Sequence, residues 1–169
     1  MKQLRLKPKA RALIVVAHPD DETIWMGGTI LRYPRVDWTV FSLSRASDLD
    51  RAPKFERVCQ RLGAKGLIAD LEDEDKLTIK SSLAPIKKLF DQMIGFCSFD
   101  YFFTHGENGE YGHKRHVGAH MALAGLLQRP EGGGRAHDQR RRQEGGQQHV
   151  RQPRREAGIE NHLHEGGRD

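Results

Sequence analysis

The stretch ALIVVAHPDDETIWMGG, residues 12–28, places a continuous apolar run directly before one imidazole and three carboxylates. A short apolar run without polar alternation is typical of a parallel strand that is covered on both faces. The acids that follow, Asp20, Asp21 and Glu22, repel one another beside a hydrophobic strand, which costs free energy unless a cation compensates their charge. The stretch therefore predicts a buried strand over residues 12–17 that leads into a cation site.

Apolar periodicity over the rest of the first 128 residues predicts alternating strands and helices. We expect strands over residues 38–43, 66–69 and 101–104, and helices over residues 22–33 and 113–127. A further helix has the apolar face Phe55, Val58, Cys59 and Leu62 and ends at Gly63, and another is opened by Ser81, Ser82 and Pro85. Asp20 or Asp21 is available to cap the first helix. This order of elements indicates a Rossmann-like, three-layer α/β/α fold with a mostly parallel sheet.

Composition disfavours several functional classes. The 169 residues suit one compact domain, and a solvated surface explains the net charge of +5 more readily than nucleic-acid binding does. Cys59 and Cys97 are too few for a disulfide framework, and we expect both to be buried thiols on apolar helical faces. No apolar run has the ~20 residues of a membrane helix, and residues 12–17 are too short for a signal peptide. We expect a cytoplasmic protein without membrane contacts, and oligomerisation stays open.

The sequence changes character after Gln128. Residues 129–169 contain five aliphatic side chains, and nine of the eighteen arginines but none of the ten lysines fall there. Such a segment cannot bury enough apolar surface to offset the entropy lost on ordering. We therefore divide the chain into a core, residues 1–128, and a low-complexity tail, residues 129–169, which is either disordered or the product of a reading-frame shift. The fold is expected to be truncated or altered at this end.

Two loops carry the side chains that can do chemistry. AHPDDE, residues 17–22, follows the first predicted strand, and HGENGEYGHKRH, residues 105–116, follows the fourth. Ligands of open α/β sheets bind at the carboxyl ends of the strands, so the two loops face each other if the fourth strand lies beside the first. His113 and His116 are three residues apart, hence on one helical face. Two histidines and one carboxylate form a common ligand set for catalytic zinc, which requires the ligands of the two loops to lie within about 10 Å of each other.

These motifs resemble those of a known family. AHPDDE with Gly27 and Gly28 shortly after it, followed downstream by GEYGHKRHVG, is similar to the PIG-L/LmbE family of zinc-dependent N-deacetylases. The resemblance extends over residues 12–127. It implies removal of an acetyl group from an N-acetylglucosamine-type small molecule. It also implies zinc as the cofactor, with Fe2+ as the alternative.

The resemblance implies three groups of site residues. The metal ligands are His18, Asp21 and His116. The residues that act on the water and the substrate carbonyl are Asp20 as general base, with His113 and Tyr111. Arg51 is expected to contact the substrate. Glu22 and His105 are further candidates for substrate contacts, and His105 could equally be a plain loop residue.

Several neighbouring residues are weaker candidates. Arg51 matches the arginine of an R-x-x-E element of the family, but Lys54 stands where the family has the acid. In the acidic run of residues 70–75, Asp75 is the best candidate for a sugar contact, although a solvated loop explains the run as well. His120 is expected to be structural, and Glu107 is either a sugar contact or a plain loop residue.

The implied reaction is amide hydrolysis by metal-activated water. Asp20 takes the proton of the water, and protonated His113, with Tyr111, stabilises the oxyanion. The alternative for the acids is that they simply cap a helix and complement its dipole.

Two other functional interpretations stay open. The first is a disrupted family member that binds metal but lacks a complete substrate pocket, because the family normally continues with at least one more strand. In that case YFFT, residues 101–104, becomes an exposed aromatic edge. The second is an RNA-binding module that acts through the tail, but nine arginines against seven acids leave a net charge of only +2 there.

Overall fold

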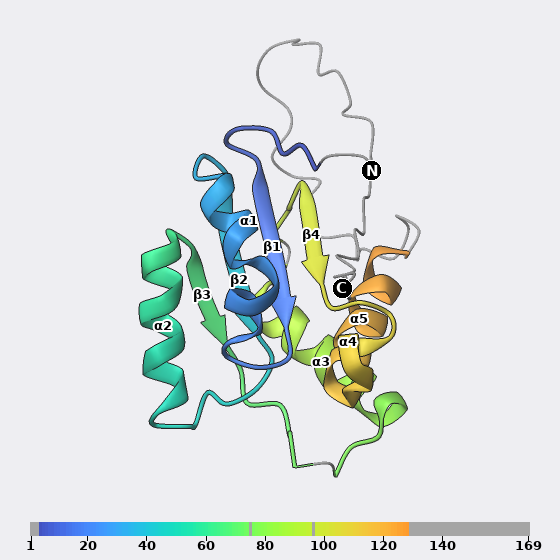
Figure 1. Ribbon diagram of the computed structural model, residues 1–169. Coiled ribbons are helices and arrows are strands. Elements are labelled where there is room, and N and C mark those ends of the chain that lie inside the picture. The colour runs from blue at the N-terminus through green and yellow to red at the C-terminus, as the bar shows by residue number, and fades with distance from the viewer. Residues whose placement is uncertain (1–3, 75, 96, 129–169) are drawn as a thin grey trace, which may run out of the picture.

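The sheet of the protein has four parallel strands in the order β3-β2-β1-β4. The structure is a computed structural model and describes residues 4–74, 76–95 and 97–128. The strands lie side by side and point the same way (Figure 1). Each lies within one residue of its predicted position: β1 (Arg11–Val16), β2 (Asp37–Ser42), β3 (Lys65–Ile68) and β4 (Tyr101–Thr104).

The four predicted helices are present with shifted ends, and one further short helix lies in the loop predicted before residue 113. The helical segments are the π-helix η1 (Glu22–Met26), α1 (Gly27–Arg32), α2 (Arg51–Leu62), α3 (Ile79–Met93), α4 (Gly109–Gly112) and α5 (Lys114–Leu127). The helix predicted over residues 22–33 is thus one π-helical segment followed by a short α-helix. α2 ends at Gly63 as predicted, in a left-handed conformation with φ of 70° that suits glycine.

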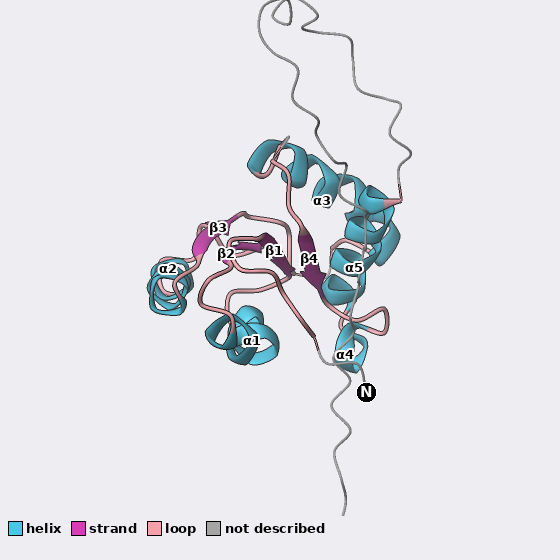
Figure 2. Cartoon of the chain, turned by 90° about the horizontal axis from the view of Figure 1, so that it is seen from above, coloured by secondary structure: helices cyan, strands magenta, loops and turns pink. Residues whose placement is uncertain are grey.

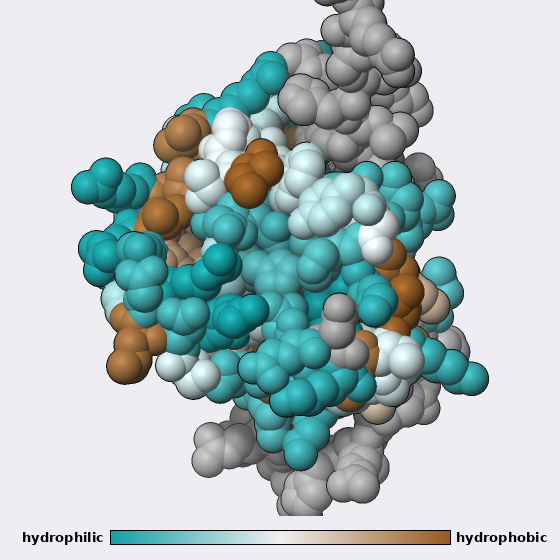
Figure 3. Space-filling model, turned by 60° about the horizontal axis from the view of Figure 1, so that its bottom comes forward, coloured by the Kyte–Doolittle hydropathy of each residue, from teal (hydrophilic) through white to brown (hydrophobic). Residues whose placement is uncertain are grey.

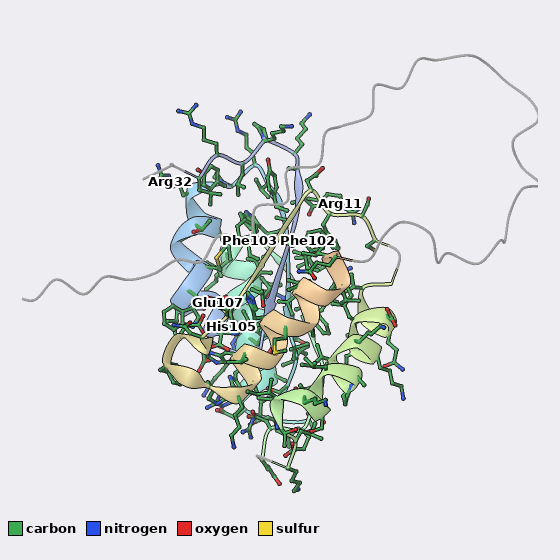
Figure 4. All side chains as sticks on the ribbon, turned by 90° about the vertical axis from the view of Figure 1, so that its right-hand side faces the viewer. Arg11, Arg32, Phe102, Phe103, His105 and Glu107 are labelled. Carbon is green, nitrogen blue, oxygen red and sulfur yellow. The ribbon has the colours of Figure 1, made fainter. Side chains whose placement is uncertain are left out.

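Strand residues alternate between two separate cores, because successive side chains of a strand point to opposite faces. Ile14 packs with residues of α1 and α2, whereas Leu13 packs with residues of α3 and α5. Phe103 and Phe102 of β4 divide in the same way (Figure 4). Seen from above, α1 and α2 cover one side of the sheet and α3 and α5 the other (Figure 2). The predicted three-layer α/β/α fold is confirmed.

The order of the strands reverses at β1. β2 and β3 lie on one side of β1, whereas β4 pairs with its other side and places Thr104 opposite Val15. Such a topological switch point is where open α/β sheets bind ligands. The fourth strand therefore lies beside the first, as the candidate site requires, and the loops after β1 and β4 leave the sheet at the same end.

α3 begins earlier than the sequence predicts. Its first residue is Ile79, and the side chain of Thr78 caps it by accepting a hydrogen bond from the backbone N–H of Ser81. Pro85 therefore lies inside the helix rather than at its start. The predicted start was wrong because serine and proline both favour a first turn, whereas the residue that caps this helix is a threonine.

Two expectations about single residues were also wrong. Asp21 precedes η1 but its side chain makes no capping hydrogen bond, because its carboxylate faces the histidines of the site instead. Cys97 is exposed, because α3 ends at Met93 and leaves this cysteine in the loop before β4. Cys59 is buried, as predicted.

The end of the chain bears on the edge of the sheet. β4 is an edge strand of the described sheet, yet Phe103 is buried and Phe102 half-buried, because helices cover both faces. Residues 129–169, and with them both interpretations of the tail, lie outside the described residues. In the part of the chain that the structure describes, no helix combines the length and apolarity needed to cross a membrane.

Gly118 of α5 tests the packing of α5 on α3. A β-carbon there would lie 2.8 Å from Oγ of Ser82, a buried hydroxyl that donates to the carbonyl of Ile79. We expect Gly118→Ala to lower the free energy of unfolding by about 1–3 kcal/mol, because either the helices separate or Ser82 loses its hydrogen bond. Chemical denaturation followed by circular dichroism measures this change.

Gly125 of the same helix provides the matched control. Apart from the nearby backbone of its own helix, no atom of the described residues lies within 4 Å of a β-carbon built there. Because alanine is the better helix former, Gly125→Ala should leave stability unchanged or raise it. Equal losses in the two variants would contradict the packing described for Gly118.

Candidate metal centre

The carboxylate of Asp21 lies at the centre of the site, with only 6% of its side chain exposed. Its Oδ2 atom lies 3.3 Å from Nδ1 of His18 and accepts a hydrogen bond of 2.9 Å from the backbone N–H of that residue. Burial alone would raise the pKa of Asp21, but the neighbouring imidazoles of His105 and His18 outweigh it and hold the pKa far below its usual range. Asp21 is therefore a buried negative charge at neutral pH.

His116 meets Asp21 from the second loop. It lies in the first turn of α5, and its Nε2 is 3.4 Å from Oδ2 of Asp21, well inside the distance that the interpretation requires. The ring centroids of His18 and His116 are 5.4 Å apart. The three predicted metal ligands thus converge where β1 and β4 end.

One nitrogen of His116 has no hydrogen-bond partner. Its Nδ1 donates to Oε2 of Glu110 at 2.7 Å, so Nε2 carries the lone pair. Among the described residues, nothing hydrogen-bonds to this buried Nε2. Burial and then the charge of His105 lower the pKa of His116 to about 4, so the ring is neutral near pH 7. A buried lone pair beside a carboxylate suits a divalent cation, and the donor set therefore fits a metal ion.

His105 stacks on His116 but its own nitrogens are occupied. The ring centroids are 3.8 Å apart and the planes are 16° from parallel. Nδ1 of His105 donates to Glu110 at 3.0 Å, and Nε2 accepts the backbone N–H of Ala17 at 3.0 Å. Ligand atoms of Asp21, His105 and His116 lie within 4.8 Å of one another, but this histidine has no lone pair to offer. With 1% of its side chain exposed, its placement favours a structural role over the predicted substrate contact.

Asp73 is a site residue that sequence reasoning missed. Its Oδ1 lies 2.9 Å from Nε2 of His18, on the other side of the ring from Asp21. Burial disfavours the charged imidazole, but hydrogen bonds with Asp21 and Asp73 outweigh it and raise the pKa of His18. Nothing in the spacing of the acidic run marks Asp73, and Asp75, the acid singled out, lies outside the described residues.

His113 lies beside His18 and His116, and Tyr111 lies beside His113 and His116. Nδ1 of His113 accepts the backbone N–H of Arg115 at 3.3 Å, so its proton resides on Nε2. Burial and then the charge of His18 lower the pKa of His113. Ligand atoms of His18, His113 and His116 lie within 4.8 Å of one another, so His113 is also placed to bind a cation. Tyr111 is 71% exposed, with its ring 5.8 Å from that of His113.

Asp20 lies on the solvent side of the first loop. Its φ of 137° is uncommon outside glycine, and the buried carboxylate of Glu22 accepts its backbone N–H at 3.0 Å. This placement favours a supporting role for Glu22 over the predicted substrate contact. The side chain of Asp20 is 56% exposed and lies 3.8 Å from Nη1 of Arg51. Burial and then the charge of Asp21 raise the pKa of Asp20.

The surroundings of the site are largely hydrophilic. Figure 3 turns the end of the molecule at which the strands finish toward the viewer, and hydrophilic residues fill its middle with apolar residues toward the rim. Figure 4 places His105 and Glu107 at the carboxyl end of β4, far from Arg11 and Arg32 at the opposite end of the sheet. Nδ1 of His120 hydrogen-bonds to the carbonyl of His105 at 2.8 Å, which fits the structural role expected for it.

Comparisons with known proteins give a short sequence match. No family model matches the chain. Thirty residues are 60% identical to the 1D-myo-inositol 2-acetamido-2-deoxy-alpha-D-glucopyranoside deacetylase 1 of Saccharopolyspora erythraea, covering 18% of this chain and 10% of that protein. The match therefore covers a small part of either protein.

Two solved structures are similar in fold. The A40926 pseudoaglycone deacetylase Dbv21 has a TM-score of 0.59 at 19% identity, over 70% of this chain and 58% of that one. The 4-carboxy-2-hydroxymuconate hydratase GalB from Pseudomonas putida KT2440 has a TM-score of 0.52 at 17% identity, over 70% of this chain and 56% of that one. The chain thus shares their α/β fold and spans little more than half the length of either.

The electrostatics of His18 predict how metal binding depends on pH. Nδ1 of His18 must lose its proton before it binds a cation, and the pKa of His18 lies above its usual 6.5. The affinity for zinc should therefore fall by up to about tenfold for each pH unit below that pKa. His116 does not add to this slope, because its pKa is about 4. Competition with a chromogenic chelator between pH 8 and pH 6 measures the effect.

His120 and His116 provide a matched pair of variants for the same titration. His120→Ala should bind zinc like the parent, because its ring contacts a backbone carbonyl. His116→Ala should lose tight binding, because it removes the unpartnered nitrogen. Equal binding by both variants, or an affinity that does not change with pH, would contradict the assignment of the centre.

Proposed function

We propose that the protein is a metal-dependent deacetylase that hydrolyses the acetamide of an N-acetylglucosamine-type small molecule, with zinc as the metal and Fe2+ as the alternative. The observation that carries the proposal is the convergence of His18, Asp21 and His116, with Nε2 of His116 buried and unpartnered. The short match to a deacetylase of an acetamido sugar and the fold shared with Dbv21 support the same reaction. The fold alone does not select it, since GalB is a hydratase.

The three converging residues would hold the ion, and the ion would supply a Lewis acid and a bound water of lowered pKa. Asp21 contributes negative charge that burial makes effective, since few water molecules screen it. His18 and His116 each place a ring nitrogen within 3.4 Å of that carboxylate oxygen. The position of His113 offers a further nitrogen or a proton donor at the same place.

Asp20 is proposed as the general base. Its side chain is exposed toward the solvent side of the site, where a substrate enters, and its pKa is raised by burial and by Asp21. A carboxylate with a raised pKa is the stronger base in its ionised form. Arg51 lies close enough to stabilise the ionised form and to orient it.

His113 is proposed to donate a hydrogen bond to the developing oxyanion. The hydrogen bond that Nδ1 accepts from the backbone leaves the proton on Nε2, so the ring can donate without carrying a positive charge. This differs from the protonated His113 that the family resemblance implies, and it follows from the lowered pKa of this residue. Tyr111, exposed beside His113, is proposed to contact the same carbonyl.

A second candidate is a metal-binding chain without a complete substrate pocket. The alignments cover 58% and 56% of the two solved chains, which favours this possibility. A protein that binds one zinc ion but releases no acetate from any N-acetylated amino sugar would support it over the deacetylase.

Substitution of Asp20 tests the proposed reaction. Asp20→Asn should lower kcat for acetate release by about 100-fold to 10,000-fold, because the amide cannot accept a proton from water. Zinc content should stay at the parental level, since Asp20 lies outside the converging ligands. Asp50→Asn removes an exposed acid paired with Lys54 and should leave both quantities unchanged. Parental activity in Asp20→Asn would exclude Asp20 as the base.

The pair formed by Arg51 and Asp20 predicts a shift in the pH–rate profile. The charge of Arg51 lowers the pKa of Asp20, so Arg51→Gln should move the acid limb of kcat/KM to higher pH. The sign follows because Asp20 must be ionised to act, and its ionised form loses a favourable partner. Both side chains are about half exposed, so added salt should shrink the difference between the parent and the variant. An acid limb that stays in place or moves to lower pH would argue against this pairing.

A further inference from the structure

We propose that two carboxylates outside the predicted ligand set act as positioning residues, each of which selects the nitrogen that one histidine turns toward the cation. The pairs are Asp73 with His18 and Glu110 with His116. The proposal rests on the proposed metal centre but assigns roles that neither motif of the sequence indicates.

Asp73 fixes the ring of His18 from the side away from Asp21. Oδ1 of Asp73 lies 2.9 Å from Nε2 of His18, so the hydrogen on that nitrogen is donated to Asp73. The other nitrogen, Nδ1, lies 3.3 Å from Oδ2 of Asp21 and would present its lone pair once a cation replaces the proton between them. An imidazole that binds a metal through one nitrogen usually donates from the other to a carboxylate in this way.

Two arginines hold the loop that carries Asp73. Nε and Nη2 of Arg45 donate to Oδ2 of Asp73 at 3.1 and 2.8 Å, which leaves Oδ1 for His18. Arg115, buried in the first turn of α5, donates to the carbonyl and carboxylate of Glu72 and to the carbonyl of Leu77. The acidic loop is therefore anchored to the same helix that carries His116.

Glu110 holds the ring of His116 through a hydrogen bond. Its Oε2 accepts from Nδ1 of His116 at 2.7 Å and from Nδ1 of His105 at 3.0 Å, while Oε1 accepts the backbone N–H of Gly106 at 2.7 Å. The backbone of Glu110 has φ of 61° and ψ of −61°, a conformation that L-residues with side chains rarely adopt. Strain of this kind persists where the surrounding contacts require it, and here they are the contacts of the carboxylate.

The two pairs together decide where the free nitrogens point. His18 donates through Nε2 and presents Nδ1, whereas His116 donates through Nδ1 and presents Nε2. Both presented nitrogens lie within 3.4 Å of one oxygen, Oδ2 of Asp21. Opposite tautomers of the two rings are therefore required, and each is set by its own carboxylate.

Replacement of each acid by its amide tests the proposal through zinc affinity. In Glu110→Gln, an NH2 group must face either Gly106 or the two imidazoles, so one set of hydrogen bonds becomes repulsive. In Asp73→Asn, the guanidinium of Arg45 attracts the amide oxygen and the NH2 group turns toward His18. That ring is then driven to the tautomer with a hydrogen on Nδ1. We expect each amide variant to bind zinc about 10-fold to 100-fold more weakly than the parent.

Asp73→Ala distinguishes tautomer selection from a structural role. Alanine removes the partner without imposing the wrong tautomer, so Asp73→Ala should bind zinc more tightly than Asp73→Asn. A residue that only supports the loop gives the reverse order, because asparagine preserves more of the packing. The matched controls are Asp70→Asn and Glu107→Gln, which remove exposed acids from the same two loops and should leave the affinity unchanged.

The outcomes separate this proposal from the proposed function. If the parent binds zinc and the amide variants bind it equally well, the positioning roles are overturned and the metal centre stands. If the parent binds no zinc, both fail. Nitrogen-15 NMR of the histidine rings in the zinc-loaded parent gives an answer that does not depend on variant folding. We expect hydrogens on Nε2 of His18 and Nδ1 of His116, and the opposite nitrogens would overturn the proposal.

Discussion

A single buried oxygen, Oδ2 of Asp21, is the constraint on which the site depends. It is nearly inaccessible to water, and the imidazoles of His18 and His116 approach it from the first and second loops. A buried carboxylate is costly unless positive charge or hydrogen bonds compensate it, so whatever occupies this position must bring protons or a cation. The raised pKa of His18 indicates that the ring readily takes up a second proton, which makes it positively charged. A bound metal ion would replace that proton and bring a larger positive charge to Asp21.

The topology of the sheet makes this arrangement available. Because β4 pairs with the free side of β1, two loops that are distant in the sequence begin a few ångströms apart at the same end of the sheet. α5 follows the second loop and carries His116 in its first turn. Before it, Gly109 of α4 packs closely against Val117, and this contact fixes how the loop approaches α5. Only glycine fits at position 109, because its φ is 65° and a β-carbon there would lie 2.8 Å from the side chain of Val117.

The fold and the chemistry are separate conclusions. Solved proteins with similar folds include a deacetylase and a hydratase, so the arrangement of strands and helices does not choose between reactions. The donor set is more selective, because it combines an unpartnered buried imidazole nitrogen, a buried carboxylate and an exposed second carboxylate on the same loop. Those groups are the basis of the proposed hydrolysis by metal-bound water, in which Asp20 rather than Asp21 would accept a proton.

The sequence by itself determined the positions of the four strands to within a residue, from their apolar runs, and it marked AHPDDE and GEYGHKRH as the two loops that carry the chemistry. Those signals are local, because periodicity and motif spacing are properties of neighbouring residues. Only the tertiary structure decided the environment of each side chain. In the folded chain, Glu22 and His105 are buried and hydrogen-bonded, and Asp73 lies beside His18. The partners of His18 and His105 come from segments far apart in the chain, and burial depends on the packing of the whole sheet, so neighbouring residues alone could not supply either.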